Sequence, residues 1–123
     1  MNVVDSCGWL EYFANGPNAD FFAPVIENVS ELIVPSISIY EVFKRVLQQR
    51  NEGDALQAIA VMMQGLVVNL DVKLALNAAK TSAQLGLPMA DSMMLATAQA
   101  YNAMLWTQDA DFENIADVQY IKK

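Results

Sequence analysis

Short apolar runs alternate with longer segments of helical periodicity along this chain, and this alternation limits the fold more than any other feature of the sequence. The apolar runs predict strands at residues 3–4, 32–34, 66–70, 103–107 and 118–121. The intervening segments predict helices at 6–15, 18–28, from Ser36 or Ser38 to 50, 52–64, 71–85 and 90–102. This order indicates an α/β layer fold around a mainly parallel sheet of four or five short strands.

Length and apolar content indicate one domain, residues 1–123, with a real hydrophobic core. Apolar runs such as 66–68 and 104–106 suit burial on both faces of a parallel sheet. No apolar run approaches the roughly 20 residues that cross a bilayer, and the N-terminus does not resemble a signal peptide. The single cysteine, Cys7, fits a reducing compartment. We therefore expect a cytoplasmic protein without a membrane span.

The absence of certain residues restricts the chemistry. With no histidine and one cysteine, the chain can build neither a Ser-His-Asp triad nor a His-ligated or structural zinc site. Hydrolysis would have to depend on carboxylates, hydroxyls and lysines, with a hard cation such as Mg²⁺. The net charge of −7 argues against a broadly basic nucleic-acid-binding surface. It does not exclude a nuclease, because a bound cation reverses the local charge of clustered acids.

Four acids stand where such a cluster would form. Asp5 ends the first predicted strand and Asp109 lies just beyond the fourth, so both should lie at the carboxyl edge of the sheet. Asp91 opens the sixth predicted helix, and Glu41 lies one turn inside the third. These positions can converge on one site.

Each acid also has a structural interpretation. Asp5 and Asp91 could be helix N-caps, and Glu41 could pair with Lys44 or Arg45 on a solvated helix face. Asp71 has the same strand-to-helix position as Asp5, so position alone does not separate a ligand from a cap.

Four stretches together resemble the PIN-domain ribonucleases, and more narrowly the VapC-like toxins of toxin–antitoxin modules. They are VVDS at 3–6, SISIYEV at 36–42, LPMADSMMLATA at 87–98 and LWTQDADF at 105–112. The resemblance covers nearly the whole chain. It implies a three-layer α/β/α sandwich and a metal-dependent endoribonuclease, commonly homodimeric, that a cognate antitoxin inhibits.

By motif match, the resemblance implies that the family's four acidic site residues are Asp5, Glu41, Asp91 and Asp109. Asp5, Asp91 and Asp109 would hold Mg²⁺ or Mn²⁺, with Glu41 completing the site or positioning a water. Ser6 and Thr107 would hydrogen-bond these carboxylates or a metal-bound water, and Asp111 would support Asp109 or share its role. Gln108 and Ala110 depart from the basic residues often found around this last motif.

Contacts to RNA and to the antitoxin are less defined by the sequence. Candidate phosphate ligands are Lys44, Arg45 and Arg50, which could equally form a solvated helix face. The antitoxin would lie in an apolar groove, for which the candidates are side chains that could equally be core: Trp9, Tyr12, Phe13, Phe21 and Phe22.

Three other functions compete with this one. A phosphoacceptor receiver domain would use Asp71, but the only late lysines are Lys122 and Lys123. A haloacid-dehalogenase-type phosphatase uses Asp-x-Asp, a spacing that Asp109 and Asp111 have, although that motif should follow the first strand. A PIN-like fold could also serve only as a non-catalytic binding module.

Overall fold

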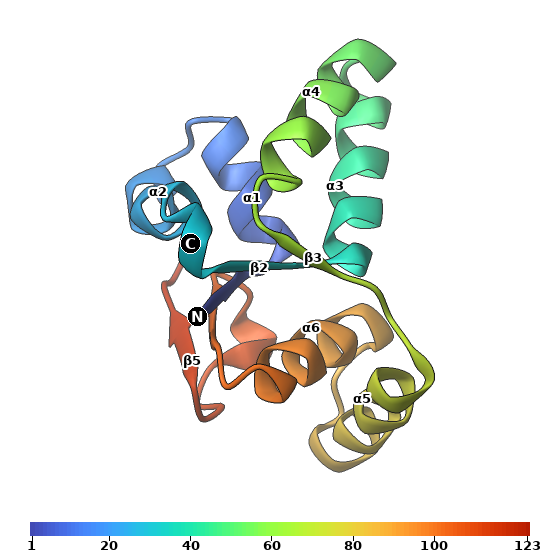
Figure 1. The fold of residues 1–123 in the computed structure, drawn as a ribbon. Helices are drawn as coiled ribbons and strands as arrows, with labels where there is room; N and C mark the ends of the chain where they lie inside the picture. The colour runs from blue at the N-terminus through green and yellow to red at the C-terminus, as the bar shows by residue number, and fades with distance from the viewer.

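A five-stranded sheet with the order β3-β2-β1-β4-β5 forms the centre of the computed structural model, which describes residues 1–123 (Figure 1). Each strand pair is parallel, and β1 lies in the middle between β2 and β4. The strands are β1 (Asn2–Val4), β2 (Leu32–Pro35), β3 (Leu66–Val68), β4 (Met104–Thr107) and β5 (Val118–Tyr120). All five predicted strands are confirmed, and the sheet is entirely parallel.

Six α-helices and two short 3₁₀ helices connect the strands. They are α1 (Ser6–Phe13), α2 (Ala19–Glu27), η1 (Val29–Glu31), α3 (Ser36–Gln49), α4 (Glu52–Met62), α5 (Val72–Leu85), α6 (Met89–Ala100) and η2 (Ala110–Phe112). The six predicted α-helices are confirmed, with ends that differ by at most two residues. None of them combines the length and the apolar character that a membrane span requires.

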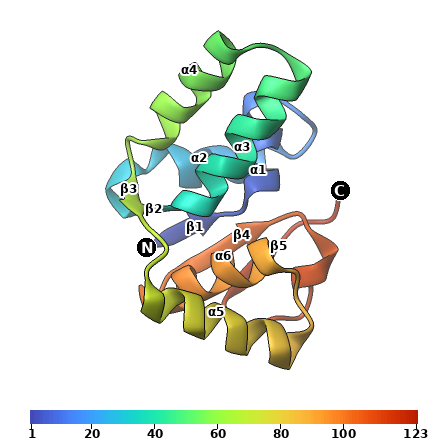
Figure 2. The same ribbon diagram turned by 90° about the vertical axis from the view of Figure 1, so that its right-hand side faces the viewer.

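The helices cover both faces of the sheet. Figures 1 and 2 show α1 to α4 on one face and α5 with α6 on the other. Alternate strand residues supply the two cores: Val3 and Ile33 pack with α5 and α6, whereas Val4 and Val34 pack with α1 to α4. The predicted three-layer α/β/α sandwich is therefore confirmed.

Two strands, β3 and β4, differ from the prediction that they are buried on both faces of the sheet. β3 pairs only with β2, and Leu66 at its start is 51% exposed. The prediction for residues 66–68 was wrong because β3 is an edge strand, which local sequence does not reveal. Met104 and Trp106 in β4 are half-buried, so the same prediction for 104–106 holds only for Leu105.

The start of α3 also differs from the prediction. Pro35 occupies the N-cap position, and neither Ser36 nor Ser38 caps the helix with its side chain. The Ser38 hydroxyl instead donates a hydrogen bond to the Pro35 carbonyl at 2.6 Å. The expected serine cap was wrong because helical geometry already begins at Ser36.

The order of the strands excludes one of the competing functions, that of a phosphoacceptor receiver domain. Receiver domains have the order 2-1-3-4-5, in which the third strand lies beside the first. Here β3 is an edge strand two positions away from β1, so residues that follow it lie far from the centre of the sheet. The receiver interpretation was wrong on this ground.

Close packing holds the first turn of α1 against the sheet. A Cβ atom at Gly8 would lie 2.6 Å from Cε1 of Phe22 and 2.7 Å from Cγ1 of Val4. Only glycine fits in this space, so α1 begins directly at the carboxyl end of the central strand. This packing fixes the position of residues 5–7, which open the candidate site.

Candidate functional site

Three carboxylates meet at the carboxyl edge of the sheet. Asp5 follows β1, and its amide donates to the Trp106 carbonyl of β4 at 2.9 Å, so the ends of these neighbouring strands lie together. Asp109 follows β4, and Asp91 comes from the first turn of α6. One carboxylate oxygen from each of Asp5, Asp91 and Asp109 lies within 4.8 Å of those of the other two. The structure thus brings together three of the four acids proposed from the sequence.

Asp5 is buried, and both of its carboxylate oxygens accept hydrogen bonds. The Ser6 amide donates to Oδ1 at 2.8 Å, and the Thr107 hydroxyl donates to Oδ2 at 2.8 Å. The Cys7 thiol also lies 3.4 Å from Oδ2. Asp5 is therefore an N-cap of α1 and a member of the carboxylate cluster at once, and its orientation is fixed.

Thr107 joins Asp5 to Asp109. Its hydroxyl donates to Asp5 and accepts a hydrogen bond from the Asp109 amide at 3.0 Å. Asp109 in turn accepts from the Asp111 amide at 2.9 Å through Oδ1, which closes the turn of η2. Asp111 is exposed, and its carboxylate acts on the site through its charge.

Glu41 reaches the site through a serine. The Ser6 hydroxyl donates to Glu41 Oε1 at 2.7 Å, which connects α3 to the start of α1. No ion pair joins Glu41 to Lys44 or Arg45, so that interpretation of Glu41 was wrong. Glu41 lies outside the group of three close carboxylates and borders it.

Asp91 does not cap its helix. Pro88 occupies the N-cap position of α6, and no side chain there makes a capping hydrogen bond. The Asp91 carboxylate is half-buried and belongs to the cluster. The cap interpretation of Asp91 was wrong because the helix begins at Met89, two residues earlier.

Burial, with a contribution from neighbouring negative charges, raises the pKa of two of these carboxylates. Burial is the main reason that the pKa of Asp5 rises to about 6, against hydrogen bonds that lower it, and the Glu41 charge adds to the rise. Burial also raises the pKa of Asp91 to about 7, with further contributions from the charges of Asp5 and Asp109. No Lys or Arg forms an ion pair with these carboxylates. The cluster therefore favours a bound cation.

The donor set fits a hard divalent cation. Carboxylate oxygens are the ligands that Mg²⁺ and Mn²⁺ prefer, and the chain has no histidine to compete for a softer metal. Asp5, Asp91 and Asp109 supply these oxygens from three different elements. The arrangement can hold such an ion at the point where the strands end.

The thiol beside Asp5 does not suit nucleophilic chemistry. Burial, together with the Asp5 charge, raises the pKa of Cys7 to about 12. Its sulfur also lies 3.5 Å from the Thr107 hydroxyl. Because a thiol of this pKa stays protonated at neutral pH, Cys7 is not an activated nucleophile.

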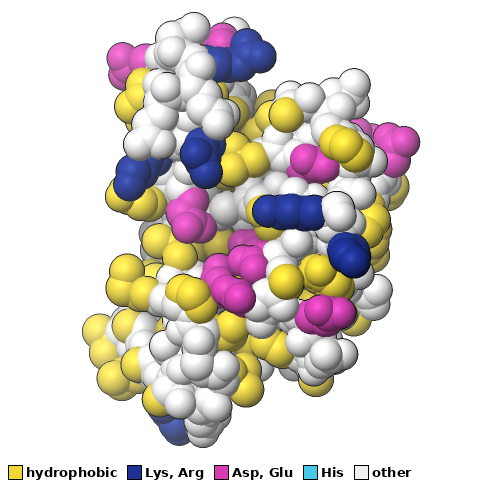
Figure 3. Space-filling model, turned by 180° about the vertical axis from the view of Figure 1, so that it is seen from behind, with side chains coloured by type: hydrophobic (Ala, Val, Ile, Leu, Met, Phe, Trp, Pro, Cys, Tyr) yellow, Lys and Arg dark blue, Asp and Glu magenta, His cyan; other side chains and the backbone are white.

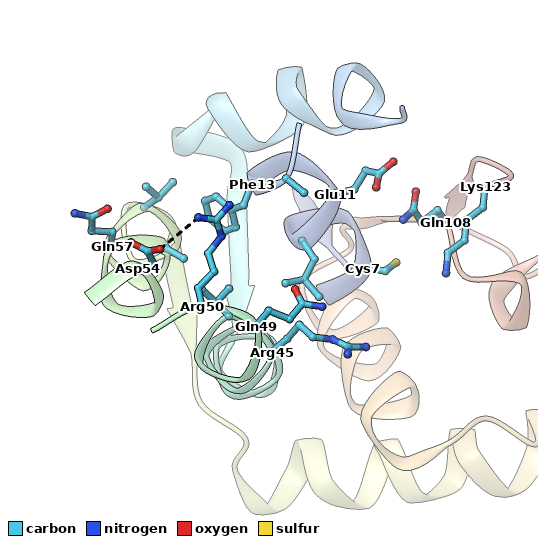
Figure 4. Close-up of a pocket in the computed structure, with 15 residues that line it drawn as sticks. Cys7, Glu11, Phe13, Arg45, Gln49, Arg50, Asp54, Gln57, Gln108 and Lys123 are labelled. Atoms are coloured by element: carbon cyan, nitrogen blue, oxygen red, sulfur yellow. Dashed lines mark ion pairs between the residues drawn. The ribbon is translucent and has the colours of Figure 1, made fainter. Parts of the chain in front are cut away.

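An open cavity of about 870 Å³ lies beside the acidic cluster, between α1, α3 and α4 (Figure 4). Cys7 and Gln108 line it, and these residues neighbour Asp5 and Asp109 along the chain. Arg45 and Arg50 line it as well, whereas Lys44 does not. The Lys44 amine instead lies 5.8 Å from the centre of the exposed Tyr40 ring.

The aromatic side chains proposed for a groove separate into three groups. Trp9 and Phe22 are fully buried core residues, so for them the groove interpretation was wrong. Phe13 lines the cavity. Tyr12 donates to Glu27 at 3.1 Å and Phe21 packs on Trp106 with ring centres 5.2 Å apart, both outside the cavity lining.

Sequence reasoning missed several residues around the site: Cys7, Asn18, Gln108 and Lys123. Cys7 lies two residues after Asp5 and Gln108 directly precedes Asp109, which was a usable signal. Nothing in the sequence pointed to Asn18, whose side chain donates to Gln108 Oε1 at 3.0 Å and to the Lys122 carbonyl at 3.2 Å.

Comparisons with known proteins place this geometry in context. A family model described as the PIN domain matches residues 3–118. No curated protein matches the chain. Among solved structures, a toxin–antitoxin complex from Klebsiella pneumoniae is 20% identical with a TM-score of 0.80, covering 97% of this chain and 96% of that chain.

Two other solved structures have a similar fold. VapC20 of Mycobacterium tuberculosis, described as a sarcin-ricin loop cleaving toxin, is 12% identical with a TM-score of 0.78, covering 94% of this chain and 95% of that chain. VapBC-1 from nontypeable Haemophilus influenzae is 21% identical with a TM-score of 0.70, covering 98% and 96% of the two chains. At these identities the similarity demonstrates the fold.

Proposed function

Because this chain belongs to the PIN domain family, we propose that residues 1–123 form one nuclease domain that hydrolyses RNA phosphodiester bonds with a divalent cation. We propose further that it is the toxin of a toxin–antitoxin pair. The observation that carries the proposal is the meeting of Asp5, Asp91 and Asp109 within 4.8 Å at the carboxyl edge of the sheet. An RNA phosphodiester is anionic, so its hydrolysis requires the positive charge that this cluster is built to hold.

Asp5, Asp91 and Asp109 are the proposed ligands of Mg²⁺ or Mn²⁺. When bound, such an ion would neutralise phosphate charge and provide a water of lowered pKa. Ser6 and Thr107 keep the Asp5 carboxylate in one orientation, because its oxygens accept from the Ser6 amide and the Thr107 hydroxyl. Thr107 also holds the backbone of Asp109.

Glu41 is proposed to orient the attacking water and accept its proton. One of its oxygens accepts from the Ser6 hydroxyl, which fixes the carboxylate at the border of the cluster. The second oxygen forms no hydrogen bond within the protein and is available to a water. Asp111 supports the turn that presents Asp109, through its backbone amide.

A cognate antitoxin is the proposed protein partner. The Klebsiella pneumoniae structure of similar fold is described as a toxin–antitoxin complex. The cavity beside the acids has apolar walls, including Leu10, Phe13 and Val61, onto which an apolar segment of an antitoxin would dock. Docking there would cover the approach to the acidic cluster.

A homodimer in the cytoplasm completes the proposal. Large apolar side chains are exposed on α5 and at the start of α6, where Val72 is 76%, Leu76 62% and Met89 68% exposed. Burying such side chains against a second copy would remove apolar surface from water. Sedimentation of the purified protein tests this association.

Cleavage of total cellular RNA tests the function. We expect cuts in Mg²⁺ or Mn²⁺, mapped by end sequencing, that disappear in EDTA and in Asp5→Asn and Asp91→Asn variants. A phosphatase that uses Asp109 and Asp111 is disfavoured because these residues follow β4 and not β1. RNA binding without cleavage by the wild type would instead favour the non-catalytic binding module.

A further inference from the structure

The few cations of this acidic chain are mostly free of carboxylate partners. The chain has 7 Lys and Arg against 14 Asp and Glu, yet only one Lys or Arg forms an ion pair, Arg50 with Asp54 at 3.5 Å. Figure 3 shows a face on which separate Lys and Arg side chains surround a group of carboxylates. Cations that stay unpaired beside so many acids are available to an external anion.

Two of these free cations line one cavity from opposite parts of the chain. Arg45 comes from α3 and Lys123 from the C-terminal segment after β5 (Figure 4). Cys7 and Gln108 line the same cavity, and the Cys7 sulfur lies 3.4 Å from Asp5 Oδ2. The cavity, with these two unpaired cations in its lining, therefore opens directly beside the acidic cluster.

The segment that carries Lys123 is held in place. The Ile121 amide donates to the Thr107 carbonyl at 3.0 Å, and the Asn18 side chain donates to the Lys122 carbonyl at 3.2 Å. Asn18 is itself anchored, because its backbone amide donates to Glu11 Oε2 at 2.8 Å. The same bonds that tie the segment to the end of β4 thus keep Lys123 at the rim of the site.

We propose that Arg45 and Lys123 are positioning residues that form a two-sided cationic clamp for an RNA strand. Each binds a backbone phosphate, one on either side of the phosphate held at the acidic cluster. This inference rests on the proposed ribonuclease function. It explains how a chain of net charge −7 binds RNA: the few free cations stand where the strand passes.

RNA suits the cavity better than an acidic peptide does. A nucleic acid strand carries one negative charge per nucleotide, so it places charges on both sides of the reacting phosphate by its own repeat. The lining of the cavity includes the half-buried Phe13, and aromatic side chains stack on bases of any sequence. An antitoxin segment in this cavity would compete with the RNA.

Salt-dependent binding tests the clamp independently of cleavage. A fluorescent single-stranded oligoribonucleotide is titrated with full-length protein in Ca²⁺ at several salt concentrations, with its integrity checked on a gel. The slope of log K against log salt is negative, and each lost phosphate contact makes it less steep by about 0.7 for a single strand. We expect this change for Arg45→Gln and for Lys123→Gln, with weaker binding at low salt.

Matched controls separate position from net charge. Lys73→Gln and Lys80→Gln remove the same charge from exposed positions on α5, away from the cavity, and should leave affinity and slope unchanged. Asn18→Ala keeps every cation but releases the Lys123 segment, so it should weaken binding. When Asn18→Ala is combined with Lys123→Gln, RNA affinity should fall little below that of Lys123→Gln alone, because both changes act on one contact.

The outcomes for the clamp and for the proposed function are distinct. Wild-type binding that depends on Arg45 and Lys123, without any cleavage, would support the clamp and contradict the ribonuclease. Cleavage by the wild type with unchanged slopes in both variants would overturn the clamp alone. The clamp is also overturned if both variants bind RNA normally but lose affinity for an acidic peptide.

Discussion

The carboxyl ends of β1 and β3 carry the same local pattern, an aspartate between a short apolar strand and a helix, with different results. Asp71 is exposed, and its side chain accepts from the Leu74 amide at 2.8 Å as an N-cap of α5. Asp5 is 4% exposed, and its second oxygen accepts from Thr107 on the neighbouring strand. β1 is the central strand and β3 an edge strand, so Asp5 has strand ends on both sides, whereas Asp71 has only that of β2 beside it. Tertiary position, and not local sequence, makes the difference between a cap and a member of a cluster.

The largest expected difference between the two aspartates is in the rate of RNA cleavage after each is replaced by asparagine. Asp5→Asn removes one negative ligand and should lower the rate by roughly 10²–10³-fold or more, the size seen when one charge-stabilising group is lost. Asp71→Asn should cleave like the wild type, because asparagine caps a helix as well as aspartate does. Rates on one end-labelled RNA provide the measurement, and a slow Asp71→Asn enzyme would contradict the contrast.

Thermal stabilisation by the metal should separate the same two positions. A ligand at 100 times its Kd stabilises the native state by about 2.7 kcal/mol, which is several degrees in Tm for a domain of this size. We expect this shift with Mn²⁺ in the wild type and in Asp71→Asn, and its loss in Asp91→Asn. An unchanged shift in Asp91→Asn would exclude Asp91 as a ligand.

The pH dependence of stability in EDTA should come from the acids around the end of β1 and not from Asp71 after β3. Burial raises the pKa of Asp5 to about 6 and that of Asp91 to about 7, so the native state keeps protons that the unfolded chain has lost. The free energy of unfolding should therefore fall as pH rises from about 4 through 7. Between pH 5 and 8 we expect a loss on the order of 2 kcal/mol, after allowance for screening at half-buried Asp91.

Urea unfolding at several pH values checks this slope. Asp91→Asn should flatten it and be more stable than the wild type at pH 8 without metal. Asp71→Asn should keep the wild-type slope. A wild-type stability that rises over this interval would show that the acids are not crowded.

The smallest expected effect is that of the cap itself. Asp71→Ala removes the acceptor for the Leu74 amide and should cost about 1 kcal/mol of stability. Asp71→Asn should cost almost nothing. Both variants should retain the full response to Mn²⁺, and a lost response in Asp71→Ala would mean that the end of β3 communicates with the site.

Hydrophobic periodicity, together with the Gly and Pro residues that end segments, was sufficient to predict the layers. It could not predict that Leu66 lies on an edge strand, since the order of strands depends on long-range pairing. The acids Asp5 and Asp109 were predictable as neighbours from the rule for parallel strand ends. The partner of Glu41 was not, because its bond to Ser6 depends on how α3 packs against α1.

The surroundings of the site were the least predictable part. Asn18 and Lys123 come from a turn and a terminal segment without periodicity, and a hydrogen bond from Asn18 to the distant Lys122 carbonyl helps to hold Lys123 at the cavity. Asp91 was open to a cap interpretation because a sequence does not reveal at which residue a helix begins. Because α6 begins at Met89, Asp91 lies inside the first turn and is not the N-cap.

The central claim is that Asp5, Asp91 and Asp109 hold one catalytic cation, and anomalous diffraction from crystals grown with Mn²⁺ tests it most directly. The account predicts a peak among these three carboxylates in the wild type and in Asp71→Asn, and none in Asp5→Asn. A peak elsewhere in a wild-type protein that cleaves RNA with Mn²⁺, with none at this cluster, would contradict it.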